Sequence, residues 1–186
     1  MELRERILNA AIDEFQEKGL KLTMDDVAKR IGISKKTLYQ VFENKEELFF
    51  AVTDYYFADM KAHEKRIMED ESLDVVEKLR RIVIAMPERY QNIGLQNLYQ
   101  LQEKFPNNYK KVSEYLDTDW DNTTALLEEG IREGKLRNCS IPVIKAMVEG
   151  TIQHFLSSRI LVDGELSFEE GLQEMIDIII DGIVKK

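Results

Sequence analysis

The sequence contains few residues that interrupt helices, with three prolines and nine glycines among 186 residues. This scarcity favours long helices, and we find no convincing strand pattern, so we expect an all-α fold of about nine helices. The single cysteine, Cys139, excludes an intrachain disulfide and fits a reducing compartment. No apolar run approaches the roughly twenty residues of a membrane span, and the first residues are charged. We therefore expect a soluble cytoplasmic protein without a signal peptide.

Motifs typical of enzymes are also missing. The chain has no phosphate-binding loop, no Gly-x-Ser-x-Gly elbow and no His-Glu-x-x-His pair, and its two histidines are far apart. We therefore expect neither catalysis nor a cofactor. Asp59 and His63 are one helical turn apart and could share a metal, but two ligands rarely suffice, so we interpret them as an exposed pair.

One stretch imitates a calcium-binding loop. Its acidic residues match positions 1, 3, 5 and 12 of that loop: Asp117, Asp119, Asp121 and Glu128. Asn122, however, replaces the glycine of the loop's sharp turn. We prefer to interpret these residues as the polar face of one helix, whose apolar stripe runs from Tyr109 to Leu127.

Charge is distributed unevenly along an acidic chain with a net charge of −9. Residues 1–47 hold 9 Lys and Arg against 10 Asp and Glu, whereas the remainder holds 17 against 25. A nearly neutral N-terminal part on an acidic body suits a protein in which only the first part meets a polyanion.

The stretch from Thr23 to Lys45 predicts two short helices joined by a turn. Thr23 can cap the first helix and Gly32 can end it. Ser34 can then cap a second helix, with Leu38 on its apolar face. Two helices joined by a short glycine-containing turn are typical of a helix-turn-helix motif.

Basic residues gather in the same stretch. No acidic residue occurs between Val27 and Phe42, whereas Lys29, Arg30 and two further lysines do. The first turn of the second helix would present side chains and free amides to phosphates or base edges. The alternative is an ordinary solvated face, because runs of charge are common on exposed helices.

The sequence of residues 7–49 resembles the N-terminal domain of the TetR family of bacterial transcriptional regulators. The matching residues are Ala10, Ala11, Phe15, Gly19, Thr23, Val27, Ala28, Gly32, Ser34, Thr37, Leu38, Tyr39, Phe42, Lys45 and Leu48. The resemblance implies a DNA-binding domain at 1–47 and a helical effector-binding and dimerisation domain at 48–186.

We expect the DNA-binding surface to comprise residues of the motif and its flanks: Thr23, Ser34, Lys35, Lys36, Thr37, Tyr39, Gln40 and Lys45. Tyr39 and Lys45 resemble phosphate contacts of the family. Lys36 and Gln40 are candidates for base edges, because lysine donates to guanine and glutamine pairs with adenine.

The family implies a homodimeric repressor that leaves a near-palindromic operator when a small molecule binds. The alternatives are an activator, an effector-independent regulator, or a helical interaction or metal-sensor protein. The last helix, from Glu165 to Lys186, is apolar nearly all round. We expect it to dimerise together with a helix from Ile141 to Leu161.

The resemblance also implies an effector pocket in the body. Pro87 should kink a helix and free a carbonyl. Residues that could converge near it are Met86, Tyr90, Tyr99, Trp120, Thr123, Met147 and His154. Because the body is acidic and shows no interior Lys or Arg cluster, we expect a hydrophobic ligand that is neutral or cationic.

Overall fold

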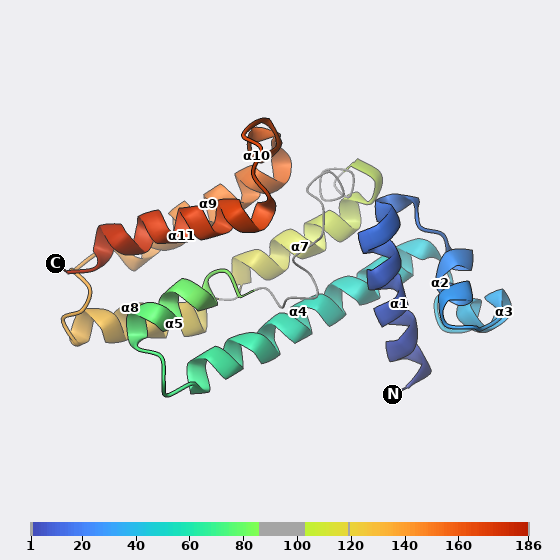
Figure 1. Ribbon diagram of the computed structural model, residues 1–186, viewed down its shortest axis with the longest axis horizontal. Helices are drawn as coiled ribbons and strands as arrows, with labels where there is room; N and C mark the ends of the chain where they lie inside the picture. The colour runs from blue at the N-terminus through green and yellow to red at the C-terminus, as the bar shows by residue number, and fades with distance from the viewer. Residues whose placement is uncertain (1, 86–102, 119, 186) are drawn as a thin grey trace. The chain divides into compact units, whose positions relative to one another are not determined.

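The computed structural model describes residues 2–85, 103–118 and 120–185, which are almost entirely helical. Within these ranges the only β-type pairing is an isolated antiparallel bridge between Leu136 and Val184. The all-α prediction is confirmed (Figure 1). The residues form two compact units, Met1–Ala58 with Asn92–Val112, and Asp59–Gln91 with Ser113–Lys186. The boundary after residue 47 concerns which part binds DNA, and it stays a prediction.

The first unit packs three short helical segments against a long first helix and the beginning of a longer one. Its elements are α1 (Leu3–Lys18), η1 (Gly19–Lys21), α2 (Met24–Arg30), α3 (Lys35–Tyr39) and the first parts of α4 (Lys45–Glu69) and α7 (Pro106–Thr118). Their apolar faces share one core, in which Ile7, Leu38 and Leu48 are fully buried. This core anchors both helices of the motif, because α2 contributes Val27 and α3 contributes Leu38 to it.

Helix ends in this unit follow the residue types that favour them. Gly19 (φ 59°) ends α1 and Gly32 (φ 70°) follows α2, both in a backbone region that glycine adopts without strain. Thr23 forms a capping box with Asp26, whose backbone N–H donates to Thr23 Oγ1 at 3.2 Å. The predicted caps at Thr23 and Ser34 are confirmed.

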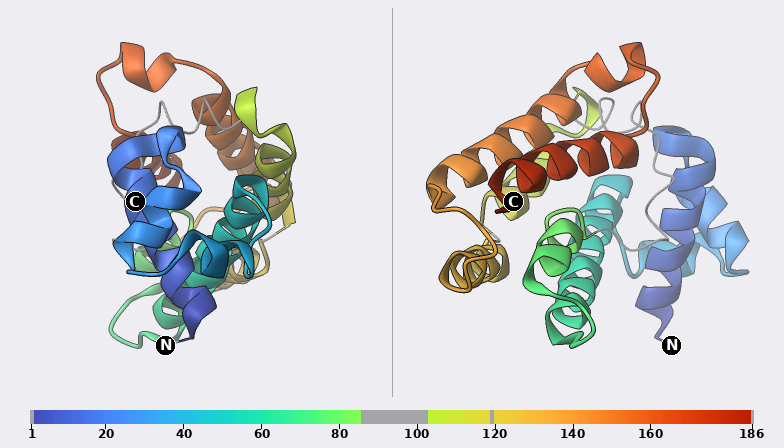
Figure 2. Two further views of the ribbon diagram at one scale, coloured as in Figure 1. Left: turned by 90° about the vertical axis from the view of Figure 1, so that its right-hand side faces the viewer. Right: turned by 60° about the vertical axis from the view of Figure 1, so that its left-hand side comes forward.

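The second unit is a set of amphipathic helices around its own core. It consists of the remaining parts of α4 and α7 with α5 (Val75–Ile82), α8 (Asp121–Arg132), α9 (Ile141–Ser157), α10 (Ile160–Asp163) and α11 (Phe168–Ile183). Helices α9 and α11 lie side by side (Figures 1 and 2). Leu79, Leu127 and Ile176 are almost completely buried in the core.

Two polar devices fix α11 in this unit. Arg80 on α5 forms ion pairs with Asp177 and Asp181 on α11. The segment after α8 binds the end of the chain, where the Arg137 backbone N–H donates to the Ile183 carbonyl at 2.8 Å. Ser167 and Glu170 form a capping box at the start of α11. In the described part of the chain, no helix is long and apolar enough to cross a membrane.

Two expectations about helix boundaries are wrong. The stripe from Tyr109 to Leu127 belongs to two helices, α7 and α8, because apolar spacing that stays in phase across a break does not reveal the break. The helix expected from Ile141 to Leu161 ends at Ser157, and the short α10 follows it.

Candidate nucleic-acid interface

Helix α3 presents polar side chains outward over a buried apolar base. Leu38 is fully buried, whereas Lys35, Lys36 and Gln40 are exposed. Tyr39 is 47% exposed, so its ring and hydroxyl are accessible from solvent. The structure therefore brings most of the residues predicted for DNA contact onto one exposed short helix.

Local capping orients the first turn of this helix. The Thr37 backbone N–H donates to Ser34 Oγ at 3.0 Å, and the hydroxyls of Ser34 and Thr37 lie 2.8 Å apart. Ser34 adopts an extended conformation, as N-cap residues do. The exposed turn at residues 34–37 is therefore fixed by its own side chains.

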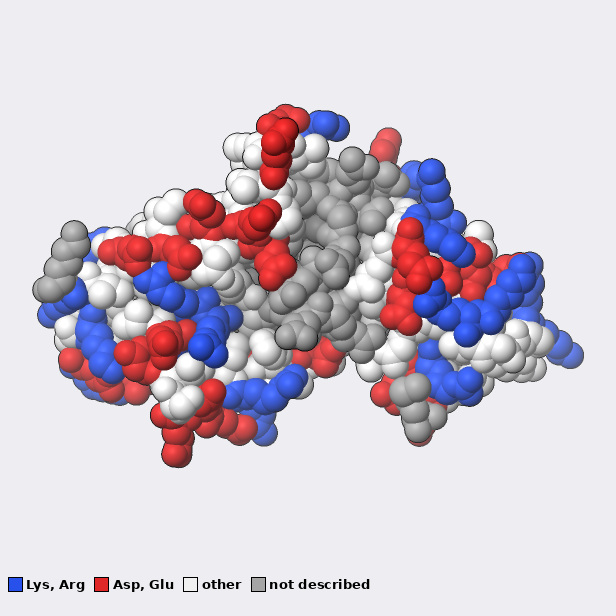
Figure 3. All heavy atoms as spheres, in the orientation of Figure 1, with Lys and Arg blue, Asp and Glu red and all other residues white. Residues whose placement is uncertain are grey.

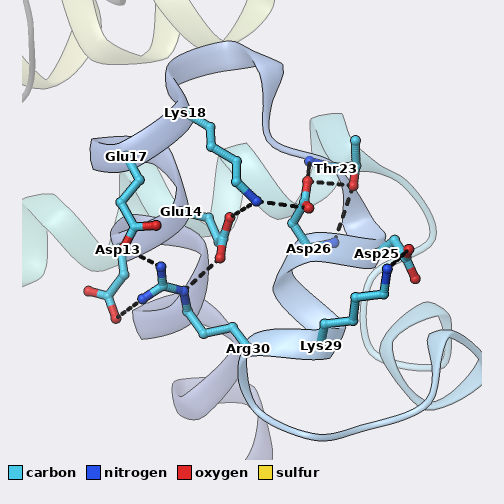
Figure 4. A network of polar contacts seen from close by, with 9 residues as sticks. All are labelled: Asp13, Glu14, Glu17, Lys18, Thr23, Asp25, Asp26, Lys29 and Arg30. Atoms are coloured by element: carbon cyan, nitrogen blue, oxygen red, sulfur yellow. Dashed lines mark hydrogen bonds and ion pairs between the residues drawn. The ribbon is translucent and has the colours of Figure 1, made fainter.

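A network of ion pairs fixes α2 against α1 (Figure 4). Arg30 pairs with Glu14 at 2.7 Å and with Glu17, and its third acidic neighbour is Asp13 at 3.7 Å. Lys18 lies between Glu14 and Asp26, at 2.7 and 2.8 Å. Glu14 is almost completely buried. Because a buried carboxylate is stable only when it is paired, this network fixes the angle between the two helices.

The pKa values of the network agree with this pairing. The hydrogen bond from Lys18 is the largest cause that lowers the pKa of Glu14, while burial opposes it and Arg30 adds to it. The pKa of Asp26 is lowered strongly, first by Lys18 and then by the two hydrogen bonds from Thr23. Both carboxylates therefore remain ionised at neutral pH.

The basic residues of the motif are less available than the sequence suggests. Lys29 and Lys35 both pair with Asp25, at 2.9 and 3.3 Å, and Arg30 is occupied by α1. Lys36 forms no ion pair with any residue in the described ranges. Figure 3 shows Lys and Arg gathered around α2 and α3, with Asp and Glu beside them. The expected positive patch is thus partly neutralised.

Two further residues predicted for DNA contact have other partners. Thr23 is exposed, but its hydroxyl and amide both donate to Asp26. Lys45 is half-buried, and its ammonium donates to the Leu20 carbonyl at 2.6 Å. Its Nζ also lies 5.4 Å from the centre of the Phe49 ring. Burial is the main cause that lowers the pKa of Lys45. The sequence offers no signal for this inward position.

Residues predicted for effector binding are dispersed over the described part of the second unit. Trp120 precedes α8 and packs partly against the core, with Lys145 Nζ 5.8 Å from its ring centre, and Thr123 is buried one turn later. Met147 and His154 are exposed on α9. Met86, Tyr90 and Tyr99, as well as the expected kink at Pro87, lie outside the described residues.

The structure adds a polar pair that sequence reasoning missed. Glu64 on α4 is buried, and its Oε2 accepts hydrogen bonds from Lys61 at 2.8 Å and from Asn122 at 3.3 Å. The signal in the sequence was the position of Asn122, which lies between Trp120 and Thr123, two residues predicted for effector binding. In the described ranges, no group of three or more His, Cys, Asp and Glu side chains could hold a metal ion.

Comparison with known proteins decides the family. Residues 7–52 match the sequence profile of the bacterial regulatory proteins of the tetR family. YhgD of Bacillus subtilis, an uncharacterized HTH-type transcriptional regulator, is 30% identical over 76% of this chain and 75% of its own. The chain belongs to the TetR family.

Further matches extend this family likeness over the whole chain. Another uncharacterized HTH-type regulator of B. subtilis, YvaF, is 28% identical over 96% of this chain and 94% of its own. A transcriptional regulator from Cytophaga hutchinsonii shares the fold with a TM-score of 0.73, at 21% identity over 97% of this chain and 98% of that one. The protein is therefore a DNA-binding transcriptional regulator with the TetR-family fold, and α2 and α3 form its helix-turn-helix.

Proposed function

We propose that the protein is a homodimeric repressor that binds a near-palindromic DNA operator and leaves it when a small hydrophobic molecule binds to the body. The observation that carries this proposal is the exposed first turn of α3, capped by Ser34 and anchored by the buried Leu38. A short, exposed helix that packs on a second helix is the geometry with which helix-turn-helix proteins enter the major groove.

The contacts to DNA divide into two classes. Lys36 and Gln40 are exposed and their side chains suit base edges, so we assign them sequence recognition. Ser34, Thr37 and Tyr39 lie on the same short helix or its cap, and we assign them phosphate contacts together with Lys35. Thr23 and Lys45 would reach phosphates only by giving up some of the hydrogen bonds described above, so we assign them smaller contributions.

Apolar side chains on α9 and α11 support the homodimer. Ile178 is 69% exposed, Val143 56% and Met147 49%. A Cβ added at Gly150 or Gly182 would meet no atom within 4 Å, so the neighbouring surface of the chain is open. A second copy that pairs these helices with their counterparts would remove this surface from water. The two DNA-binding domains of the dimer would then contact half-sites roughly 34 Å apart or a multiple of that distance.

The effector is assigned to the second unit. Trp120, the N-cap residue of α8, and Thr123 in its first turn flank Asn122 in sequence, and the Asn122 side chain donates to the buried Glu64; this pair supplies polar groups beside apolar ones, as ligand sites require. We keep Met86, Tyr90, Tyr99 and His154 as further candidates, whereas we assign the exposed Met147 to the dimer surface described above. An acidic body favours a neutral or cationic hydrophobic ligand. A difference of roughly 1–3 kcal/mol between its affinities for the two states would suffice for regulation.

DNA binding measured over a range of salt concentrations tests the first part of this proposal. Duplexes selected by the protein from a random library serve as operators, and a scrambled duplex serves as the reference. We expect steep salt dependence, and we expect Lys36→Ala and Gln40→Ala to relax sequence preference by about 1–3 kcal/mol at their own base pairs. Lys65→Ala, an exposed lysine of the second unit, is the control. Binding without salt dependence or sequence preference would favour the helical interaction protein instead.

Fluorescence of Trp120, the only tryptophan, tests the effector site. Neutral aromatic compounds and hydrophobic cations are titrated while operator release is followed in the same samples. We expect both signals to change at the same ligand concentration. A true inducer that releases the Trp120→Phe protein and the Tyr90→Ala protein just like the parent would remove these two residues from the site.

A further inference from the structure

Asp25 is the acidic side chain that joins the two helices of the motif. It belongs to the first turn of α2, and its two oxygens take different lysines: Oδ2 pairs with Lys29 of the same helix at 2.9 Å, and Oδ1 pairs with Lys35 of α3 at 3.3 Å. Figure 4 shows the first of these contacts. One carboxylate thus occupies two of the lysines that a DNA duplex would otherwise attract.

The stability of the fold does not account for this arrangement. All three side chains are at least one-third exposed, and ion pairs at such positions contribute little to folding. The neighbouring Asp26 differs, because it closes the capping box of α2 and binds Lys18 of α1. Lys29 is the largest cause that lowers the pKa of Asp25, which therefore stays ionised near neutral pH. A permanent negative charge next to α3 opposes a polyanion.

We propose that Asp25 determines specificity by withholding Lys29 and Lys35 from DNA of arbitrary sequence. The inference deepens the proposed function and rests on it. On a random duplex, each lysine gains a phosphate only by leaving a carboxylate, so the electrostatic gain is small. On the operator, base contacts from Lys36 and Gln40 fix the register of α3, and a phosphate at a defined place can replace Asp25 as the partner of Lys35.

Asp25 also acts as a positioning residue for Lys35. A free lysine side chain has many rotamers and finds phosphates in many registers, which favours binding without sequence preference. Held by Asp25 Oδ1, the ammonium group of Lys35 starts from one place beside the first turn of α3. Specificity therefore depends mainly on the Asp25–Lys35 pair, so removing Asp25 should change the specificity ratio most while Lys35 is present, although Lys29 is released in either case.

Asp25→Asn tests the proposal, because asparagine keeps the size of the side chain and removes its charge. Affinity is measured for a duplex selected by the wild-type protein and for a scrambled duplex of the same composition, each at several salt concentrations. We expect binding to the scrambled duplex to tighten about tenfold and its salt slope to steepen by about one to two, since up to two lysines are released. Binding to the selected duplex should tighten less, by about threefold at most, so the specificity ratio falls.

Two further proteins separate this role from a general effect of charge. Asp13→Asn removes the same charge from α1, where Asp13 faces Arg30 rather than a lysine of the motif, and should leave the ratio unchanged. In a Lys35→Ala background, Asp25→Asn should no longer change the ratio by more than a small amount. If Asp25→Asn tightens both duplexes equally, or acts equally without Lys35, the proposal is wrong. Wild-type protein that binds no duplex in a salt-dependent way would instead refute the proposed function itself.

Discussion

The two compact units use their exposed helices differently. In the first unit, the charged side chains of α2 are paired with α1 and α3, as Arg30 and Asp25 show. In the second, α9 and α11 leave apolar side chains exposed, above all Ile178. Water solvates paired charges well but not an apolar stripe, so these surfaces suit different partners: a polyanion for the first and a second copy of the chain for the second.

Breaking the apolar surface should have the largest effect on DNA binding. Ile178→Glu places a charge where the proposed partner helix would lie, so we expect a folded monomer at micromolar concentration. Because two linked DNA-binding domains bind far more tightly than one, operator affinity should fall by at least about 100-fold. Sedimentation and operator titration measure the two effects.

Ile176 provides the matched control on the same helix. It is 1% exposed and points into the core, whereas Ile178 is exposed. Ile176→Ala should lower the free energy of unfolding by about 2–5 kcal/mol through the cavity it leaves. Ile178→Ala should lower it far less. A dimer that survives Ile178→Glu would contradict the assignment of this surface.

Breaking the ion-pair network between α1 and α2 should have a smaller effect, and it should change the stability of the fold rather than dimerisation. Arg30→Met keeps much of the side-chain volume but leaves the buried Glu14 with Lys18 alone. We expect the free energy of unfolding to fall by about 1–3 kcal/mol in urea. Lys29→Met removes only an exposed ion pair and should change it by less than about 0.5 kcal/mol. If the free energy of unfolding falls equally in the two proteins, the ion-pair network contributes no more to stability than an exposed ion pair does.

Acid should weaken the same ion-pair network. The folded-state pKa values of Glu14 and Asp26 lie below their ordinary values of 4.5 and 3.8. Their contributions are therefore complete above these values and are lost as pH falls through the folded-state pKa values. We expect urea midpoints to decline below about pH 4.5. For Asp26→Asn, the difference from wild type should be largest at neutral pH and shrink below pH 3.8. A difference that stays constant down to pH 2 would show that ionisation of Asp26 is irrelevant.

Periodicity and capping predicted much of the fold because they act between neighbours in sequence. Thr23 and Ser34 mark the starts of α2 and α3 as expected, and Gly19 ends α1. The break before α8 was missed, because apolar spacing stays in phase there. Boundaries that leave the period unchanged carry no such signal.

The candidate site was harder to predict, since charge pairing depends on distances across the fold. A run of basic residues without an acid, from Val27 to Phe42, predicted a positive patch. The carboxylates that neutralise it lie earlier in the sequence, in α1 and at Asp25. Likewise, no local pattern places the ammonium of Lys45 on the Leu20 carbonyl. Exposure of the first turn of α3 was predictable, because Leu38 defines its buried face.

Replacing Lys45 should have the smallest effect on DNA binding. This residue tests whether a side chain of the first unit stabilises the fold, contacts DNA, or does both. Its ammonium is already bound to the Leu20 carbonyl and lies near the Phe49 ring. A phosphate would therefore replace existing interactions rather than add to an unpaired charge. Lys45→Met, which keeps the packing against the rings, should weaken binding to selected and scrambled duplexes alike, by about threefold, and flatten the salt slope by less than one. If the salt slope is unchanged while the free energy of unfolding falls, Lys45 supports the first unit and does not contact DNA.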